Sequence, residues 1–162
     1  MKTYSYLMIS AVLTASIVMA AADPFAGTWK LNARKSKYAP GECPKSMVIE
    51  METAGDGIRY RSETEYANGR KSQARYTADY NGAEVIVMGA NGLLAPVSLK
   101  RIDSNTVVAS YLRAMQVIAT SRRVVSKNGQ VMTITTTSTD KDGKSVTSVG
   151  VYEKVETVAQ KN

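Results

Sequence analysis

The sequence contains no histidine, and this absence removes the side chain that enzymes use most often near neutral pH. Without it the chain has no usual general base, no usual zinc ligand and no proximal haem ligand. Glycine-rich phosphate loops and the Gly-x-Ser-x-Gly pattern of serine hydrolases are missing as well. These absences predict a protein that is not an enzyme and that has no catalytic site, metal or cofactor.

Paired carboxylates could still act as an acid and a base. The candidates lie two positions apart, Glu50 with Glu52 and Glu63 with Glu65. That spacing puts each pair on one face of a strand, which we interpret as the solvent face. An isomerase- or cyclase-like enzyme remains the catalytic alternative, with its acid drawn from Tyr60, Tyr76 or Tyr152.

Cysteine is nearly absent, because Cys43 is the only one in the chain. No internal disulfide can form, so the stability of the fold must come from packing. We expect a free cysteine in a loop, and a disulfide between two chains is the alternative.

The N-terminus has the pattern of an export signal. Lys2 supplies a positive charge, the apolar run Leu7–Ala20 follows, and small residues suited to cleavage end at Ala20 or Ala22. The run is shorter than the roughly twenty apolar residues that span a membrane. We therefore predict a signal peptide over residues 1–22, with a membrane anchor as the alternative.

The predicted signal implies export, to the periplasm or out of the cell. What remains is one domain of ordinary size, residues 23–157, and a short tail, residues 158–162. The net charge is +7, yet Lys and Arg alternate with Glu, as in Arg59–Glu63. This scattered pattern argues against a nucleic-acid-binding arm. We expect a monomer that does not insert into a membrane after the signal is removed.

No helical period appears after the signal, and extended runs closed by turn residues recur instead. Asn-Gly and Asp-Gly pairs such as Asn68-Gly69 separate many of these runs, and both tolerate the positive φ angles of tight hairpins. Consecutive hairpins make an antiparallel meander. The strands are expected at Phe25–Asn32, Ser46–Thr53, Ile58–Tyr66, Lys71–Tyr80, Glu84–Met88, Val97–Ile102, Thr106–Arg113, Gln116–Ser126, Gln130–Thr139 and Ser145–Val155.

An open meander of this length would twist strongly and expose two edges, and closure into a barrel removes them. The predicted fold is therefore all-β, a single antiparallel up-and-down barrel of about eight to ten strands. A two-sheet sandwich is the alternative, although it usually needs longer crossover connections. An outer-membrane barrel would need an apolar outer face on most strands, and the charged faces described next argue against it.

Two of the expected strands alternate between charged and uncharged residues, which separates an outer face from an inner one. We assign to solvent Arg59, Arg61, Glu63, Glu65, Lys71, Gln73, Arg75 and Asp79. We assign to the interior Ile58, Tyr60, Ser62, Thr64, Tyr66, Ser72, Ala74, Tyr76, Ala78 and Tyr80.

Small and hydroxyl-bearing residues on the inner face leave space, unlike the close-packed aliphatic core of a solid domain. Adaptable methionines are expected to add to this inner wall, namely Met47, Met51, Met88 and Met115. The pattern predicts an internal cavity. Filling of that space by side chains from the far wall is the alternative.

The two ends of the domain resemble a known family. Phe25–Leu31 resembles the opening strand of fatty-acid-binding proteins, and lipocalins share its Gly27-x-Trp29 core. Tyr152-Glu153-Lys154 is similar to the closing strand of the same family. The connection Ala33–Lys45 is too short, and too rich in Lys, Pro and Gly, for that family's helical lid. The chain therefore resembles the calycin barrels, and among them a lidless, bacterial-type exported lipocalin-like domain.

The resemblance implies roles for several residues. Trp29 would close one end of the barrel as a structural residue. Fatty-acid-binding proteins hold a ligand carboxylate with an Arg-x-Tyr pair and a further arginine. Tyr152 matches the tyrosine, whereas Gly150 stands at the paired arginine. Arg122 is the best match to the further arginine, and because Arg123 points to the opposite face, only one of the two lines the interior.

Ligand binding in the interior is the leading functional hypothesis, with the protein as an exported carrier of a small apolar or anionic amphipathic molecule. The alternative is an interaction or inhibitor module that presents loops on a rigid barrel and has no internal ligand. Leu93 and Leu94 would then anchor a partner, and otherwise they would cover the barrel mouth. The residues assigned to ligand binding are Tyr152, Arg122, Tyr60, Tyr76, Ser62 and Met51.

Overall fold

The computed structural model describes residues 22–39, 41–89 and 92–156. The predicted signal peptide lies outside these residues apart from Ala22, and so does the predicted tail. Within the described residues we find no helical segment that combines the length and the apolar character needed to cross a bilayer.

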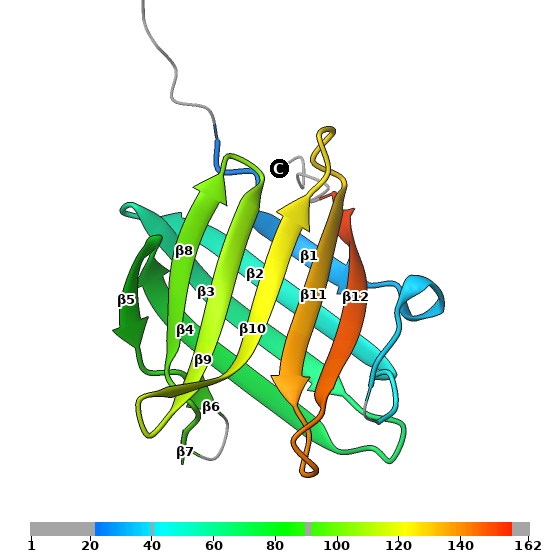
Figure 1. The fold of residues 1–162 in the computed structure, drawn as a ribbon. Helices are drawn as coiled ribbons and strands as arrows, with labels where there is room; N and C mark the ends of the chain where they lie inside the picture. Colours follow the sequence, from blue (N-terminus) through cyan, green and yellow to red (C-terminus); the bar gives the residue numbers. More distant parts are fainter. Residues whose placement is uncertain (1–21, 40, 90–91, 157–162) are drawn as a thin grey trace, which may run out of the picture.

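Antiparallel strands dominate the described chain (Figure 1). In chain order they are β1 (Gly27–Leu31), β2 (Ser46–Ala54), β3 (Gly57–Glu65), β4 (Lys71–Asp79), β5 (Asn81–Val85), β6 (Met88–Gly89), β7 (Gly92–Leu93), β8 (Val97–Asp103), β9 (Thr106–Arg113), β10 (Gln116–Val125), β11 (Val131–Thr139) and β12 (Ser145–Val155). The expected strands recur close to their expected bounds, with one exception.

The exception is the run Glu84–Met88, which we expected to be one strand. The structure divides it, because β5 pairs with β8 whereas β6 pairs with β4 and β7. Between them Val87 is buried while its neighbour Ile86 is exposed. The chain therefore passes from one wall of the molecule to the other within this run.

All the strands belong to one sheet, in the order β5-β8-β9-β10-β11-β12-β1-β2-β3-β4-β6-β7. β1 lies between β12 and β2, so the first and last strands of the chain are side by side. Figure 1 shows β8 to β12 crossing in front of β1 to β4, so the sheet curls back on itself. The predicted all-β, antiparallel up-and-down barrel fold is confirmed, and the two-sheet alternative is not what forms. The sheet has twelve strands where about eight to ten were expected, and it keeps two ends, at β5 and β7, so the barrel is only partly closed.

Glycine is required at two positions of the hairpins around β3. Gly69 adopts a φ of 79° in the turn between β3 and β4, where its N–H donates to the carbonyl of Tyr66 at 2.9 Å. Gly57 opens β3, and a Cβ there would collide with the backbone of Ala78 on β4. These glycines fix the register in which the outer face of β3 meets that of β4.

The predicted inner and outer faces of β3 and β4 are confirmed. Arg59, Arg61 and Arg75 are exposed, and Tyr60 and Tyr76 are buried with their rings stacked at 4.7 Å between centroids. Ser72 is the exception, because it is exposed rather than interior.

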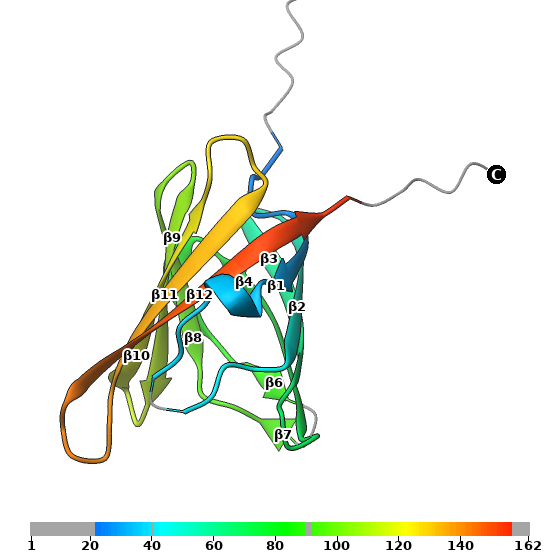
Figure 2. The ribbon, with the colours of Figure 1, turned by 90° about the vertical axis from the view of Figure 1, so that its right-hand side faces the viewer.

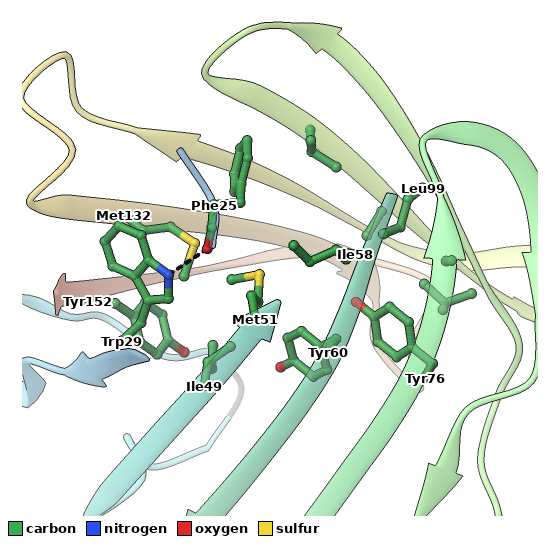
Figure 3. Close-up of a cluster of buried hydrophobic side chains, with 14 of the residues drawn as sticks. Phe25, Trp29, Ile49, Met51, Ile58, Tyr60, Tyr76, Leu99, Met132 and Tyr152 are labelled. Carbon is green, nitrogen blue, oxygen red and sulfur yellow. Dashed lines mark hydrogen bonds between the residues drawn. The ribbon is translucent and has the colours of Figure 1, made fainter. Parts of the chain in front are cut away.

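One end of the barrel interior is packed with apolar side chains, which we call the apolar half. Its centre is Trp29, fully buried, whose indole N–H donates to the carbonyl of Phe25 at 2.8 Å (Figure 3). Met132 lies beside the indole ring in Figure 3 and is also fully buried. Trp29 is therefore a buried residue of the core, in agreement with the structural role that the sequence resemblance implies. The other members are Phe25, Ile49, Met51, Ile58 and Leu99.

The segment before β1 is fastened across the barrel to β8. The carboxylate of Asp23 accepts hydrogen bonds from the Arg101 guanidinium at 2.7 Å and from the Tyr80 hydroxyl at 2.9 Å. The Arg101 guanidinium also lies over the rings of Tyr80 and Phe25. These contacts close the barrel end beside the apolar half.

Between β1 and β2 the described residues contain a single 3₁₀ turn, Ala33–Lys35, and no helical lid. Figure 2 shows this turn beside β12. The chain then continues beside the first part of β12, before the residues that pair with β1, and there Lys37 and Val149 exchange backbone hydrogen bonds of 2.8 and 2.6 Å. The expectation of a lidless barrel therefore holds for the described part of this connection.

Candidate functional site

Arg123 on β10 is the arginine that enters the barrel. It is 3% exposed, and Ser121 and Val125, two positions away on either side, are buried with it. Arg122, the arginine assigned to ligand binding as the best match to the resembled family, is exposed on the outer face, so Arg123 is the one of the two that lines the interior. The reason is the period of two along a strand, which turns neighbouring residues to opposite faces.

Arg123 lines a partly open cavity of about 170 Å³ inside the barrel. It lies beyond the apolar half, and we call this part of the interior the polar half. Several strands and the connection before β2 contribute to its wall, which includes Arg123, Tyr38, Tyr60, Tyr111, Tyr152 and Met47. A cavity is therefore present, as the inner-face pattern predicted, but side chains from the far wall fill much of the remaining interior.

The guanidinium of Arg123 has few partners. Its Nη2 donates to the Tyr111 hydroxyl at 3.2 Å, and its centre lies 5.2 Å from the middle of the Tyr60 ring. The buried Nε has no hydrogen-bond partner. No carboxylate of the described residues forms an ion pair with it. Since arginine stays protonated in proteins, the polar half holds a positive charge without a counter-ion.

The surrounding tyrosines do not neutralise this charge. Burial raises the pKa of Tyr60 to about 12, although the nearby charge of Arg123 opposes the rise. Burial also raises the pKa of Tyr76 and of Tyr152. These side chains are therefore neutral phenols at neutral pH, able to donate hydrogen bonds to an anion. The buried hydroxyl of Tyr76 makes no hydrogen bond of normal geometry with the described residues, although the nearby Arg123 guanidinium opposes the rise in its pKa.

Tyr152 on β12 is the hydroxyl whose place the sequence resemblance implies. Its oxygen lies 3.2 Å from the Tyr38 hydroxyl and also donates to the sulfur of Met47 at 3.2 Å. Gly150, two residues earlier, gives these rings their space. A Cβ added there would lie 2.8 Å from the Tyr152 ring and 2.9 Å from the Tyr38 hydroxyl oxygen.

The other residues assigned to ligand binding fall in different places. Tyr60 lines the cavity, and Tyr76 stacks on Tyr60. Ser62 is buried on the same face of β3, yet it is not part of the cavity wall. Met51 packs in the apolar half and is not part of the cavity wall.

Two of the methionines assigned to the inner wall do not lie there. Met115 is 92% exposed at the turn between β9 and β10, and Met88 on β6 is also exposed. The turn at Met115 holds its backbone at a φ of 62°, so the side chain follows a hairpin tip and not the alternation of a strand. Met47 does line the cavity.

Sequence reasoning missed two of the cavity tyrosines. Tyr111 follows the inward positions Val107 and Ala109 at steps of two on β9, so strand periodicity could have identified it. Tyr38 lies in a connection without regular structure, where no periodic signal exists.

A larger hollow, of about 660 Å³, lies beside the outer faces of β3 and β4 near Ile86 and Met88. Two of its arginines are already paired, Arg59 with Glu52 at 2.9 Å and Arg61 with Glu63 at 2.7 Å. Their charges are compensated and exposed, whereas that of Arg123 is neither. We therefore regard the smaller internal cavity as the candidate site.

No group of three or more potential metal-ligating residues occurs in the part of the chain that the structure describes. Cys43 is a free, half-buried cysteine in the connection before β2.

Comparisons with known proteins place the fold. No family model matches the sequence, and no curated protein matches it. Among solved structures, a Schistosoma mansoni fatty acid binding protein in complex with arachidonic acid matches with a TM-score of 0.60 at 16% identity, over 82% of this chain and 97% of that chain. Zebrafish ileal bile acid-binding protein complexed with cholic acid matches with a TM-score of 0.55 at 16% identity, over 82% and 99%. The chain thus has the calycin-type β-barrel fold of the fatty-acid-binding proteins.

Proposed function

We propose that the protein binds a small anionic ligand with an apolar body inside its barrel, and that it is an exported carrier without catalytic activity. The observation that carries this proposal is the buried guanidinium of Arg123 without a counter-ion. Burial of an unpaired charge lowers the stability of the fold by several kcal/mol, and a bound anion would offset this cost. Neutral tyrosine hydroxyls beside the guanidinium supply the further donors.

The ligands named for the two structural neighbours support the apolar part of the proposal. Arachidonic acid and cholic acid are both carboxylic acids with large apolar bodies. In this chain an acid group would meet Arg123, and Met47 and Ile134 would contact the apolar body. A carboxylate suits this place because it can accept two parallel hydrogen bonds from one guanidinium.

Export is the second part of the proposal, and it rests on the pattern of residues 1–22. Cleavage after Ala20 or Ala22 would leave the described barrel whole, including the contacts that Asp23 makes with Arg101 and Tyr80. We therefore propose a lipocalin-like monomer of the periplasm or of the extracellular space.

The experiment is native mass spectrometry of the protein purified from its own host. We expect the wild-type protein to carry an anionic ligand, Arg123→Met to carry none, and the matched control Arg122→Met to carry it at the wild-type level. A ligand retained equally by Arg123→Met would contradict the assignment.

An interaction module remains the second candidate function, and exposed apolar residues favour it. Leu94 is 50% exposed, so it does not cover the barrel mouth completely. The structure does not describe the side chain of Leu93. Changing both leucines to Ser should abolish capture of an envelope partner in a pull-down, and unchanged capture would exclude this loop as the anchor.

A further inference from the structure

The size of the polar half limits what can bind there. Its cavity of about 170 Å³ is smaller than ordinary ligand pockets, which start at roughly 300 Å³. It is close to the roughly 150 Å³ of an apolar cavity that takes up one benzene molecule. The described interior therefore has room for about one ring with its acid group.

The apolar half prevents the ligand from extending toward the closed end of the barrel. Four of its side chains have no exposed surface, namely Trp29, Ile49, Leu99 and Met132. Ile58 is almost as deeply buried. A long chain entering there would have to displace packed side chains, and overpacking a core typically costs about 1–3 kcal/mol.

Tyr38 forms part of the cavity wall on the side of the connection before β2. Its backbone is fixed to β12 by the two hydrogen bonds between Lys37 and Val149, and the N–H of Ala39 donates to the Ser148 hydroxyl at 3.0 Å. From this anchored segment the half-buried Tyr38 ring reaches the cavity wall, where its hydroxyl meets that of Tyr152.

Gly150 is what allows Tyr38 to occupy this place. Any side chain at this position would begin with a Cβ only 2.9 Å from the Tyr38 hydroxyl oxygen. Tyr38, which comes from the connection before β2, therefore occupies the space that a side chain at position 150 of β12 would fill. Its ring narrows the cavity without adding a charge.

The wall chemistry indicates the shape of a suitable ligand. Arg123 offers an unpartnered Nε, and Tyr38, Tyr111 and Tyr152 also line the cavity. The stacked rings of Tyr60 and Tyr76 lie beside the guanidinium. Carboxylates bind guanidinium groups in a planar, two-point arrangement, and flat rings pack well on tyrosine faces.

On the basis of the proposed function, we propose that the ligand class is a compact carboxylate of about one aromatic ring, and that Tyr38 is the residue that determines this specificity. Replacement of Tyr38 by a small residue would open the cavity past Gly150 toward the connection before β2. Longer carboxylates would then be accepted.

The experiment is isothermal titration of the ligand-free exported protein with three probes: benzoate, hexadecanoate and inorganic sulfate. We expect the wild-type protein to bind benzoate at least about tenfold more tightly than either of the other two. Tyr38→Ala should raise hexadecanoate affinity by about tenfold, whereas Tyr38→Phe should keep the wild-type order, because the ring and not the hydroxyl excludes the chain.

Arg123→Met separates failure of this inference from failure of the proposed function. If hexadecanoate binds the wild-type protein best, the size limit is wrong, and if sulfate binds best, the preference for a carboxylate with a ring is wrong. In both cases the anion site stands if Arg123→Met abolishes the binding. If no probe shows binding that depends on Arg123, the proposed function is wrong as well. The wild-type order of the probes needs no variant, so it decides the size limit even if Tyr38→Ala does not fold.

Discussion

The two halves of the barrel interior are built from the same alternating strands and belong to one continuous cluster of buried side chains, yet they differ in polarity and in packing. The apolar half surrounds Trp29 with close-packed side chains, and the one polar atom of that indole is satisfied by the Phe25 carbonyl. The polar half surrounds Arg123 with tyrosines and a cavity, and it holds two buried polar atoms without partners, the Nε of Arg123 and the hydroxyl of Tyr76. The first arrangement stabilises a fold, and the second costs stability.

This difference indicates that the apolar half stabilises the fold and that the polar half serves function. Burial of apolar surface contributes about 25 cal/mol for each Å², so the apolar half supplies much of the free energy of folding. A buried charge and an unpartnered hydroxyl oppose folding, and such features persist where function requires them. The comparison can be tested by changing each half separately.

The largest expected effect is in the apolar half. Trp29→Ala removes the largest fully buried side chain and leaves the Phe25 carbonyl without its donor. We expect the free energy of unfolding to fall by about 3–5 kcal/mol in urea denaturation. A loss under about 1 kcal/mol would show that this half does not carry the stability assigned to it.

Alkaline pH should weaken the polar half. Burial raises the pKa of Tyr60 from 10.0 to about 12, so the folded state holds this proton more tightly than the unfolded chain. The contribution to stability is fully present below pH 10 and is lost as the pH rises from 10 to about 12. Urea unfolding at several pH values should show this decline, and Tyr60→Phe should reduce it. A flat profile for the wild-type protein up to pH 12 would contradict the burial of this phenol.

A smaller effect, with the opposite sign, is expected at Tyr76. Tyr76→Phe removes a buried hydroxyl that has no partner in the described residues. We expect the free energy of unfolding to rise by about 1 kcal/mol, because the unpaired group no longer has to be desolvated. A clear loss of stability would mean that the hydroxyl is satisfied, for example by an ordered water molecule.

The strands and their faces could be predicted from the sequence because both signals are local. Turn pairs such as Asn68-Gly69 mark hairpins, and the alternation from Ile58 to Tyr66 separates the inner face from the outer one. The division between β5 and β6 was not predicted, because it depends on which strands they pair with across the barrel.

The site could be predicted only in part. Val124 and Val125 are both apolar, so the sequence of β10 fits either phase and does not decide between Arg122 and Arg123. A bulge between Val117 and Ala119 adds to that ambiguity, since it shifts the register against β9. Tyr38 and the final cavity volume depend on contacts between distant segments, which carry no signal in the local pattern.

The central claim is that the buried guanidinium of Arg123 binds an anionic ligand. Urea unfolding curves measured with and without ligand test it most directly. Wild type, Arg123→Met and Arg122→Met would be unfolded in urea without ligand, with benzoate and with hexadecanoate. Without ligand, we predict that Arg123→Met is more stable than wild type by about 1–4 kcal/mol. A carboxylate at a hundred times its Kd should stabilise wild type and Arg122→Met by about 2.7 kcal/mol and leave Arg123→Met unchanged. Lower stability of Arg123→Met without ligand, together with equal stabilisation of all three proteins by the carboxylates, would contradict the account.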